Sequence, residues 1–592
     1  MQDQFEDSQS SRLRGCLGGL AIYVLILGLL VAIILLPPIS AVDRVLSYGY
    51  ADIPEEGGFV TAEDGAQLLI LPEGLQGRTK VKFTAIPRSS FLQGAAGNGL
   101  LTAAESIPLW LIMKSPYYQI QFRGQEPTKV MVRIPMPIDS EPLRTLDLYS
   151  WNGAAWEWLP HFLPPGDDFI EAELDYLPRS VVVVQTKPLQ PSISASLPQA
   201  TDLPQQARDT LEEINPQGLY LDALGAIRGD PGALLQPDQA AGYQVVPTLR
   251  NWEEEDALRS DLVDNMLADS STRQEHVQRI VELVVGNAYP GVDIDYRGIS
   301  PDLHGEYTDF ITQLADALHE QGKQLSVRVE APQQIAADQW DTGAYNLRAI
   351  GAVADRVRLP LPSDSGAYVP GGQTDTLLQY AVGEVDRYKV RPLISTRSTG
   401  WIDGTLRAVP YAEALAPFSQ VAVEGGSTSL APGQGVAFTL AGPEPSSGIQ
   451  FDPNSGIYWV AYAGSEGQQN TVWVENAASM ARKLGYVVDY NLEGVAVHNL
   501  LGEENDSQIW GVLDKFVNLV IPPVEGQLAV AWQVRSASGE VLAQESAELA
   551  NPRYVWTAPA EAGDYSVTAA ISSDGGATAA GRGSLSVSVA AP

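Results

Sequence analysis

Along residues 50–186, short runs of alternating apolar and polar residues lie between Gly- and Pro-rich turns. Examples are AQLLILPEG, TKVKFTAIP and TKVMVRIPMP. A period of two is typical of strands that bury one face, so this region predicts an all-β sandwich. In WNGAAWEWLP, Trp151, Trp156 and Trp158 fall on or near an expected hairpin. Aromatic rings at a hairpin can stack on sugars, although packing in a sandwich core is their commoner use.

The pattern changes after this region. A stretch rich in Pro, Ser and Gln at 187–214 has no apolar period, so we expect an extended linker there. Over residues 215–518, apolar runs alternate with helical stretches such as GEYTDFITQLADALHEQGK, which Gly322 ends. Strand–helix repetition over this length predicts a (β/α)8 TIM barrel. Within it, residues 420–462 have the pattern of a β-rich insertion.

The last part of the chain, residues 521–592, returns to β patterning in QLAVAWQVRS and GSLSVSVAAP. Its WTAP and AGDYSV segments resemble bacterial immunoglobulin-like or fibronectin type III-like modules, so a C-terminal β-sandwich is expected. The resemblance implies a spacer or an adhesive domain.

An uncharged apolar segment covers residues 16–42 and is long enough to span a bilayer core of about 30 Å. Arg12 and Arg14 precede it, so residues 1–15 are expected to be a cytoplasmic tail and the bulk of the chain to be extracytoplasmic. A cleaved signal peptide is the alternative, but the apolar segment is longer than usual for one. We therefore expect a single-pass protein of the cell membrane.

Composition narrows the choice of partners. The chain has 592 residues, enough for several domains, with 72 acidic and 37 basic residues and a net charge of −35. Nucleic acid is therefore not an expected partner. Cys16 is the one cysteine, so no intrachain disulfide can form. The five histidines do not show metal-ligand spacing, and we expect neither a metal nor another cofactor.

The stretch PGVDIDYRGI is the candidate for chemistry. Its strand GVDID would place Asp293 and Asp295 on one face, at the carboxyl end of a barrel strand. Two adjacent carboxylates repel, so one of them tends to hold a proton or to share a hydrogen bond. The alternative is structural: a strand-end aspartate that caps the next helix or pairs with Arg297.

The same stretch resembles the glycoside hydrolase family 18 signature, D-G-x-D-x-D-x-E, through Gly291, Asp293, Asp295 and Tyr296. The segments GLYLDALGAIRGD, YTDFITQLADALHEQGKQLSVRV and VWVENAASMARKLGYVVDYNLEGVAVHNLLGEENDSQIW resemble the spore-cortex-lysin and peptidoglycan-hydrolase branch. The resemblance covers about residues 215–518. It implies a TIM barrel that acts on N-acetylated glycan.

The resemblance also implies roles for these residues. In the family, the last glutamate of the signature protonates the glycosidic oxygen, and the adjacent aspartate orients the substrate's own N-acetyl group for attack. By position, Asp295 would be the orienting residue and Asp293 its partner, while Arg297 replaces the acid. A guanidinium stays protonated at any working pH, so it cannot donate that proton usefully. Pro290 replaces the first aspartate of the signature.

Two more departures from the family also argue against ordinary hydrolysis. The strand that supplies a tyrosine and an aspartate appears as VRLPLPSDS, and the usual tryptophan of the last strand is His498. Glu330 and the run at 253–255 are the candidates for a substitute acid. The candidates for binding glycan in the barrel mouth are Trp252, Tyr296, Glu330, Tyr368, Trp401 and His498.

Three functions follow from these observations. The favoured one is a membrane-anchored pseudoenzyme that binds cell-wall or other N-acetylated glycan. The second is an active, divergent glycosidase that cleaves glycan of the chitin or peptidoglycan type. The third is a structural surface protein whose barrel mouth binds nothing. Arg297 could neutralise the two aspartates or face an anionic sugar.

Overall fold

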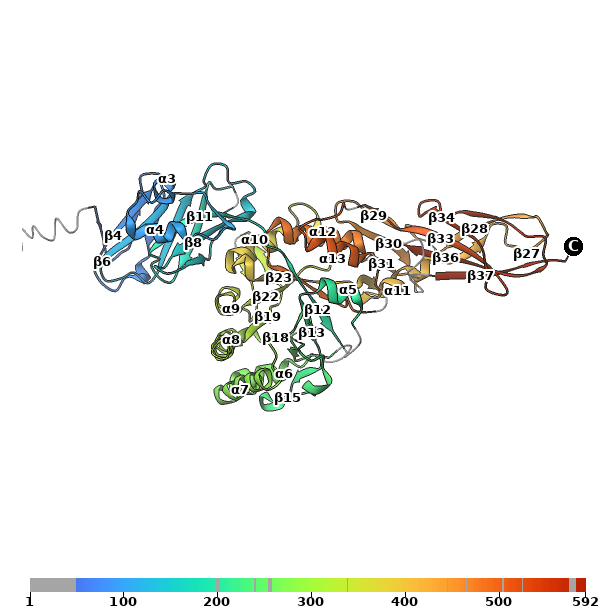
Figure 1. Ribbon diagram of the computed structural model, residues 1–592, viewed down its shortest axis with the longest axis horizontal. Coiled ribbons are helices and arrows are strands. Elements are labelled where there is room, and N and C mark those ends of the chain that lie inside the picture. Colours follow the sequence, from blue (N-terminus) through green and yellow to red (C-terminus); the bar gives the residue numbers. More distant parts are fainter. Residues whose placement is uncertain are drawn as a thin grey trace, which may run out of the picture. The chain divides into compact units, whose positions relative to one another are not determined.

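The computed structural model describes residues 49–591 apart from 165, 199–202, 239–240, 254–257, 338, 445, 465, 503–504, 524 and 574–581 (Figure 1). The expected cytoplasmic tail and membrane segment, residues 1–42, lie outside the described residues. Within the described part of the chain, no helix is both long and apolar enough to cross a membrane. The chain divides into two compact units, and the main part of the second begins at Gln185.

The first unit contains two antiparallel sheets, as its alternating pattern predicts. One sheet has the order β1 (Ala51–Ile53), β4 (Thr79–Ile86), β6 (Tyr117–Gly124), β11 (Ser180–Thr186), β8 (Leu146–Trp151), β9 (Trp156–Leu159). The other has the order β10 (Phe169–Leu174), β7 (Val130–Pro135), β3 (Gln67–Ile70), β2 (Gly58–Thr61). Two short helices, α3 (Arg88–Leu92) and α4 (Asn98–Glu105), follow β4.

The predicted tryptophan hairpin is present. In it β8 and β9 pair antiparallel, with Trp151 opposite Trp156. The ring of Trp156 packs edge-on against Phe91 and Tyr117, and its indole Nε1 donates to the carbonyl of Ala103 at 2.9 Å. These contacts bury the ring against its own unit, which is the packing use of an aromatic residue.

The second unit contains a closed barrel of parallel strands. Their order is β12 (Ser192–Leu197), β13 (Glu213–Pro216), β16 (Gln244–Val245) with β17 (Thr248–Arg250), β18 (Gly291–Asp295), β19 (Gln324–Arg328), β22 (Arg356–Pro360), β23 (Val390–Ser395), β32 (Gly494–His498). The barrel closes because β32 pairs with β12, and because β16 and β17 together take the place of the third strand. Of these two successive segments, β16 pairs with β13 and β17 pairs with β18. A hairpin of β14 (Leu219–Leu221) and β15 (Ile227–Arg228) extends the sheet beside β17.

Helices follow the strands. They are α5 (Gln205–Thr210), α6 (Ser260–Ala268), α7 (Ser270–Gly286), α8 (His304–His319), α9 (Leu347–Val353), α10 (Gln373–Glu384), α12 (Ala477–Asp489) and α13 (Ile509–Phe516). The clearest sequence pattern is confirmed in α8, where Tyr307, Phe310, Leu314 and Leu318 are fully buried. Gly322 takes a positive φ of 65° just beyond the helix, a conformation that favours glycine at such an end.

The expected linker at 187–214 is wrong in one respect, because it contains the first barrel strand and α5. All six residues of β12, the sequence SISASL, are buried between β32 and β13. Its alternation of serine with Ile193, Ala195 and Leu197 is itself a period-two pattern. The three serines masked the signal, since they lower the apolar content without making the segment a flexible spacer.

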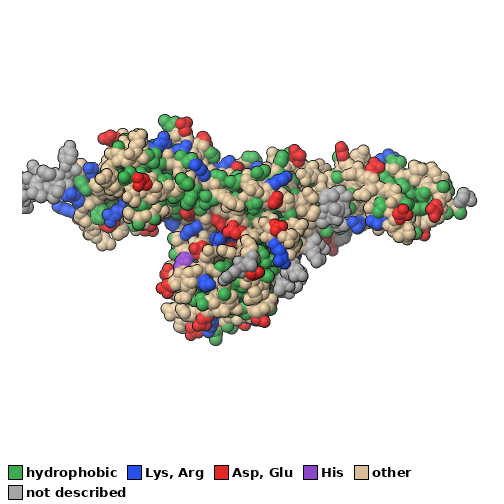
Figure 2. All heavy atoms as spheres, in the orientation of Figure 1, with side chains coloured by type: hydrophobic (Ala, Val, Ile, Leu, Met, Phe, Trp, Pro, Cys, Tyr) green, Lys and Arg blue, Asp and Glu red, His purple; other side chains and the backbone are tan. Residues whose placement is uncertain are grey.

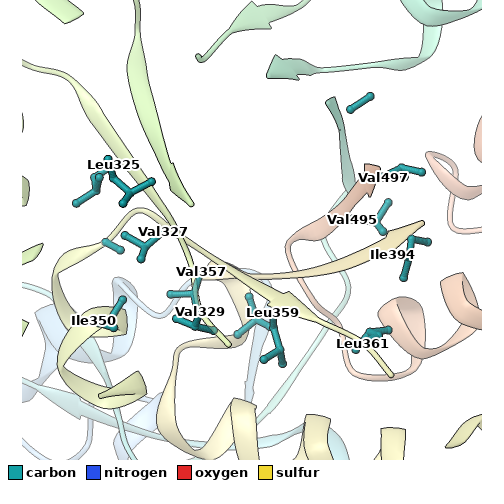
Figure 3. Close-up of a cluster of buried hydrophobic side chains, with 14 of the residues drawn as sticks. Leu325, Val327, Val329, Ile350, Val357, Leu359, Leu361, Ile394, Val495 and Val497 are labelled. Atoms are coloured by element: carbon teal, nitrogen blue, oxygen red, sulfur yellow. The ribbon is translucent and has the colours of Figure 1, made fainter. Parts of the chain in front are cut away.

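The outward faces of the barrel strands form the apolar layer beneath the helices. Figure 3 shows this layer on four neighbouring strands: Leu325 and Val327 of β19, Val357 and Leu359 of β22, Ile394 of β23, and Val495 and Val497 of β32, with Ile350 of α9. All are at most 5% exposed, and burying each stabilises the fold by about 1.5–3 kcal/mol.

The segment 420–462, expected as a β-rich insertion in the barrel, divides among three sheets, one of which receives the short strand β27 (Ser429–Leu430) and is described below. Its first strands, β26 (Gln420–Val423) and β28 (Gly435–Ala441), form a sheet with β35 (Tyr554–Thr557). The rest joins an antiparallel sheet in the order β25 (Thr405–Val409), β24 (Ser398–Ile402), β31 (Gln469–Val474), β30 (Ile457–Ala463), β29 (Gln450–Asp452).

The C-terminal β region is therefore completed by strands from earlier in the chain. Its second sheet has the order β27 (Ser429–Leu430), β37 (Arg582–Val589), β36 (Gly563–Ser572), β33 (Ala529–Ser536), β34 (Val541–Glu548). Phe438 of β28 packs against Trp532 and Tyr554, with ring centroids 6.4 and 6.3 Å away. The pattern of residues 521–592 alone could not reveal these distant partners.

Candidate functional site

The inward face of the barrel is polar and charged, although bulky aliphatic residues usually fill such an interior. Alternation along the strands separates the two faces: in GVDID, Val292 and Ile294 enter the apolar layer while the aspartates face inward. The inward polar side chains include Glu213, Asn215, Thr248, Arg250, Asp293, Asp295, Ser326, Arg328, Arg358, Arg391 and His498.

One ionic cluster occupies the amino-terminal part of this interior. Arg391 is fully buried, with Nη2 2.7 Å from Glu493 and Nη1 3.2 Å from Glu213. Its Nη2 also donates to the Ser192 hydroxyl at 2.6 Å. Burial raises the cost of ionising Glu493, but the charge of Arg391 outweighs it and lowers the pKa of Glu493 to about 2.

Asp293 lies above this cluster and is fully buried. Its carboxylate accepts hydrogen bonds from the Thr248 hydroxyl at 3.0 Å and the Ser326 hydroxyl at 2.9 Å. Arg358 Nη1 contacts the same carboxylate, and its Nη2 donates to the side-chain oxygen of Asn215 at 3.2 Å. Burial raises the pKa of Asp293, while the charge of Arg358 opposes the rise. Every oxygen of this carboxylate is thus occupied by protein.

Asp295, one pleat nearer the mouth, is held by two arginines. Arg297 Nε donates to Oδ1 at 2.8 Å and Arg297 Nη2 donates to Oδ2 at 2.7 Å, a bidentate pair. Arg328 Nε lies 3.7 Å from Oδ1. Burial opposes ionisation of Asp295, but the hydrogen bonds and charge of Arg297 prevail and lower its pKa to about 2. Asp295 is therefore a carboxylate at neutral pH.

The position of Arg297 is fixed from several sides. The Asn251 side chain accepts from the backbone N–H of Arg297 and donates to its carbonyl, both at 2.9 Å. The Arg297 guanidinium lies over the ring of Trp252, 3.7 Å from the centroid, and Arg250 lies 4.5 Å from the same ring. Cation–π contact of this kind contributes about 0.5–2 kcal/mol. The arginine is thus held against Asp295 by its backbone and its aromatic neighbour.

A glycine sets the start of the strand that delivers the two aspartates. At Gly291 a side-chain Cβ would collide with the carbonyl of Gln324 on β19. The backbones of β18 and β19 approach closely here, because Gly291 and Gln324 are register partners in the parallel pair. Glycine is required at this position for that close approach.

A cavity of about 300 Å³ lies at the carboxyl ends of β18, β19, β22, β23 and β32. Its lining includes the cationic side chains of Arg297, Arg328, Arg397 and Lys483. Pro360, Leu361, Pro362, Leu393, Ile394 and Tyr368 supply apolar surface, and Ser363, Ser395, Thr399 and Asn499 supply hydroxyl or amide groups. No residue described within 420–462 belongs to the lining.

No protein-family model matches this chain. Two curated proteins of Bacillus subtilis (strain 168) are similar. The uncharacterized glycosylase YvbX is 23% identical over 263 residues, which are 43% of this chain and 69% of that protein. The putative sporulation-specific glycosylase YdhD is 24% identical over 250 residues, 41% of this chain and 54% of that protein.

Both relatives carry the name glycosylase, and solved structures of glycoside hydrolases are similar to this chain at low identity. Among solved structures, a family 18 N-acetylglucosaminidase from Paenibacillus barengoltzii is 13% identical, with a TM-score of 0.41. That comparison covers 56% of this chain and 99% of the other. The chain spans about half the length of YdhD.

The barrel brings only some of the predicted site residues together. His498 and Tyr368 line the cavity beside Arg297. Burial lowers the pKa of His498 to about 3, and the positive charge of Arg358 adds to this effect, so the imidazole is neutral at pH 7. Tyr368 is 1% exposed, and its hydroxyl donates to the Pro362 carbonyl at 2.6 Å. It forms a wall rather than an open stacking platform.

Other predicted residues lie elsewhere. Tyr296 points out of the barrel interior, because it is fully buried against His276 and Phe310 in the helix layer. Trp252 is covered by Arg297 and Arg250, as described above. Glu330 accepts a hydrogen bond from the backbone N–H of Gly298 at 2.9 Å and does not belong to the cavity lining. Its observed contact is with the turn after β18, outside the cavity.

Trp401 is the predicted aromatic residue with an exposed ring. It lies on β24, two residues beyond Thr399, which lines the cavity. Side chains two apart on a strand share a face, so Trp401 extends the face that begins at the cavity. Its exposed fraction is 46%, and its cross-strand partner Leu406 is 55% exposed.

Sequence reasoning missed Glu475 and Lys483. Glu475 follows β31 and lines the cavity, where Lys483 Nζ lies 2.5 Å from its Oε2 and the Ser479 hydroxyl donates to its Oε1 at 2.8 Å. Both partners come from α12, at a spacing of four residues. The signal in the sequence was the pair of polar residues Ser479 and Lys483, four positions apart and therefore on one face of the helix, shortly after Glu475.

Proposed function

We propose that this protein is a membrane-anchored, extracytoplasmic glycan-binding protein whose family 18-like barrel is catalytically impaired. One observation carries the proposal: the residue at the position of the family's acid, Arg297, forms two hydrogen bonds with Asp295. A permanent cation there cannot protonate a glycosidic oxygen. Loss of a general acid costs about 10² to 10⁴ in rate.

The pairing removes more than the acid. In the family 18 scheme the aspartate beside the acid orients the N-acetyl group of the substrate, which requires a free carboxylate oxygen. Here Arg297 occupies both oxygens of Asp295, at 2.8 and 2.7 Å. A substrate acetamide would have to displace a bidentate, charge-assisted pair before it could be oriented.

A glycan ligand is supported by the site and by the two relatives. Both Bacillus subtilis relatives carry the name glycosylase. The cavity combines apolar walls with hydroxyl and amide groups, as recognition of a sugar ring requires. Trp401 supplies an exposed aromatic ring on the same strand face as Thr399, where a neighbouring sugar of the chain would stack.

The test is equilibrium binding together with turnover. Purified full-length protein in detergent should bind soluble peptidoglycan fragments or chitin oligomers saturably and release no reducing ends from them. Absence of binding to every glycan would refute the proposal and favour a structural surface role.

A second candidate function, an active glycosidase, is favoured by Glu475. This glutamate is the carboxylate in the described cavity lining, and it follows β31, a strand outside the barrel sheet. Lys483 and Ser479 hold its two oxygens, at 2.5 and 2.8 Å. If turnover is found, Glu475→Gln should abolish it in this alternative, whereas Glu330→Gln should not.

A further inference from the structure

We propose that the barrel mouth is an anion subsite that takes a sugar unit bearing a carboxylate. The inference rests on the proposed function, because it specifies the charge of the glycan that the same cavity would bind. It starts from four cationic side chains that line one cavity of about 300 Å³: Arg297, Arg328, Arg397 and Lys483.

The charges at the mouth do not cancel. Glu475 neutralises Lys483, and Asp295, behind the cavity wall, is shared by Arg297 and Arg328. The imidazole of His498 is neutral and does not change this balance. Two cations therefore remain in excess around a small cavity, in a chain whose net charge is −35. On the face drawn in Figure 2, basic and acidic side chains are interspersed, so this local excess is a feature of the mouth.

Arg328 provides the observation that points to a ligand. Its Nε and Nη1 atoms are buried and have no hydrogen-bond partner among the described residues. The 3.7 Å to Asp295 Oδ1 is an ion-pair distance, too long for a hydrogen bond. A buried guanidinium with unused N–H groups costs free energy, which an incoming acceptor would recover. Arg328 belongs to the cavity lining and 13% of its side chain is exposed, so an acceptor in the cavity can approach the guanidinium.

Asp295 cannot supply the missing acceptor. Both of its oxygens are bound by Arg297, and Asp293 is bound by Thr248, Ser326 and Arg358. The interior carboxylates are thus already paired, while Arg328 and the exposed Arg397 retain unused donor capacity toward the cavity. A planar carboxylate matches the fork of a guanidinium.

The rest of the lining fits a sugar ring that carries this carboxylate. A cavity of about 300 Å³ is at the lower end of the range for small ligands, which suits one sugar unit. Leu361, Pro362 and Leu393 offer apolar surface to the ring, and Ser395, Thr399 and Asn499 offer partners to its hydroxyl groups. Two sources share the chemistry: a lactyl ether, as on muramic acid, and a uronic acid.

Calorimetric titration of the full-length protein with two disaccharides tests the inference. N-acetylglucosaminyl-N-acetylmuramic acid and N,N′-diacetylchitobiose differ by the lactyl group, so their affinity ratio measures the contribution of the carboxylate. We expect the acidic disaccharide to bind at least about tenfold more tightly. A third arm, an oligomer that alternates N-acetylglucosamine with glucuronic acid, distinguishes a uronate from a lactyl source by which acidic ligand binds more tightly.

Variants assign the effect to the cavity. Arg328→Met and, separately, Arg397→Gln should each reduce the affinity ratio at least about threefold, while Arg407→Gln should leave it unchanged. Arg397 and Arg407 are both exposed; Arg397 directly precedes β24, whereas Arg407 lies within β25, opposite Gly400. Arg397→Gln therefore tests the inference even if Arg328→Met fails to fold.

Equal affinity for the two disaccharides would overturn the anion subsite and leave the glycan-binding function standing. A ratio that persists in both variants would also overturn it. No binding of any of the three ligands would refute the proposed function itself.

Discussion

Arg297 binds Asp295 through two parallel hydrogen bonds of 2.8 and 2.7 Å, at the carboxyl end of the fourth strand of the barrel. The guanidinium lies over Trp252 on its other side. With 27% of its side chain exposed, Arg297 remains part of the cavity wall while it neutralises the aspartate. The sequence motif, the hydrogen-bond geometry and the local charge of the cavity wall therefore all depend on this pair.

Exchange of this arginine for an acid should not create a strong hydrolase. Arg297→Glu restores the carboxyl group but leaves Arg328 beside Asp295 and His498 at the position of the family's tryptophan. We expect the rate on chitin oligomers to stay within about tenfold of that of Arg297→Gln, which removes the cation without adding an acid. A gain of hundredfold or more would mean that the rest of the site is intact.

The Arg297–Asp295 pair should give the protein a specific dependence on acid. The folded-state pKa of Asp295 is about 2, below its usual 3.8. The pair therefore contributes stability above about pH 4 that is lost as the pH falls toward 2. The shift corresponds to about 2 kcal/mol.

Denaturant unfolding of wild type and Asp295→Asn at several pH values measures this contribution. The difference in free energy of unfolding should be largest at pH 5–7 and should shrink between about pH 4 and pH 2. A difference independent of pH over this range would show that Asp295 is not ionised by Arg297.

The buried arginine deeper in the barrel should matter more for stability. Arg391→Met removes the cation that lies closest to the buried carboxylates of Glu213 and Glu493, which then share the more distant Arg356, at 3.5 and 3.3 Å. We expect the free energy of unfolding to fall by about 3–5 kcal/mol. Arg407→Met, at an exposed arginine, should change it by less than about 0.5 kcal/mol in the same denaturant titration. Equal effects of the two substitutions would contradict this reading of the ionic cluster.

Trp401 should contribute to affinity and not to stability. Trp401→Ala removes a ring that is 46% exposed on the strand face leading from the cavity, and we expect glycan binding to weaken about tenfold. Leu542→Ala is the matched control, because Leu542 is 45% exposed on β34 of the C-terminal β region. If both variants bind as wild type, the glycan does not reach β24.

The membrane anchor remains a prediction from the apolar segment at 16–42 and the arginines before it. Protease added to intact cells should digest the barrel, since it would lie outside the membrane. A cytoplasmic marker protein should survive the same treatment. Protection of the barrel until the cells are lysed would refute the extracytoplasmic placement.

How much of this could be read from the sequence depended on local periodicity. The period of 3.6 in α8 and the period of two in GVDID gave a helix and the direction of Asp293 and Asp295, because these patterns depend on neighbouring residues alone. The partners of those aspartates could not be read in this way. Arg358 lies 65 residues from Asp293, and only barrel closure brings the two together.

The same limit explains the errors. Tyr296 directly follows Asp295, so its side chain turns to the opposite face and packs with His276. Alternation was sufficient to exclude it from the mouth. Glu475 and Lys483, in contrast, enter the cavity from the region after the interrupting sheet, where no strand pattern of the barrel marks them. The linker was misassigned because serine in SISASL resembles spacer composition.

Reducing-end release is the most direct test of the central claim that the barrel binds glycan without cleaving it. Full-length wild type and Asp295→Asn would be incubated with peptidoglycan and with chitin oligomers, at protein concentrations that saturate binding. The account predicts bound ligand and the same background release for both proteins. Turnover by the wild type that Asp295→Asn abolishes would contradict it.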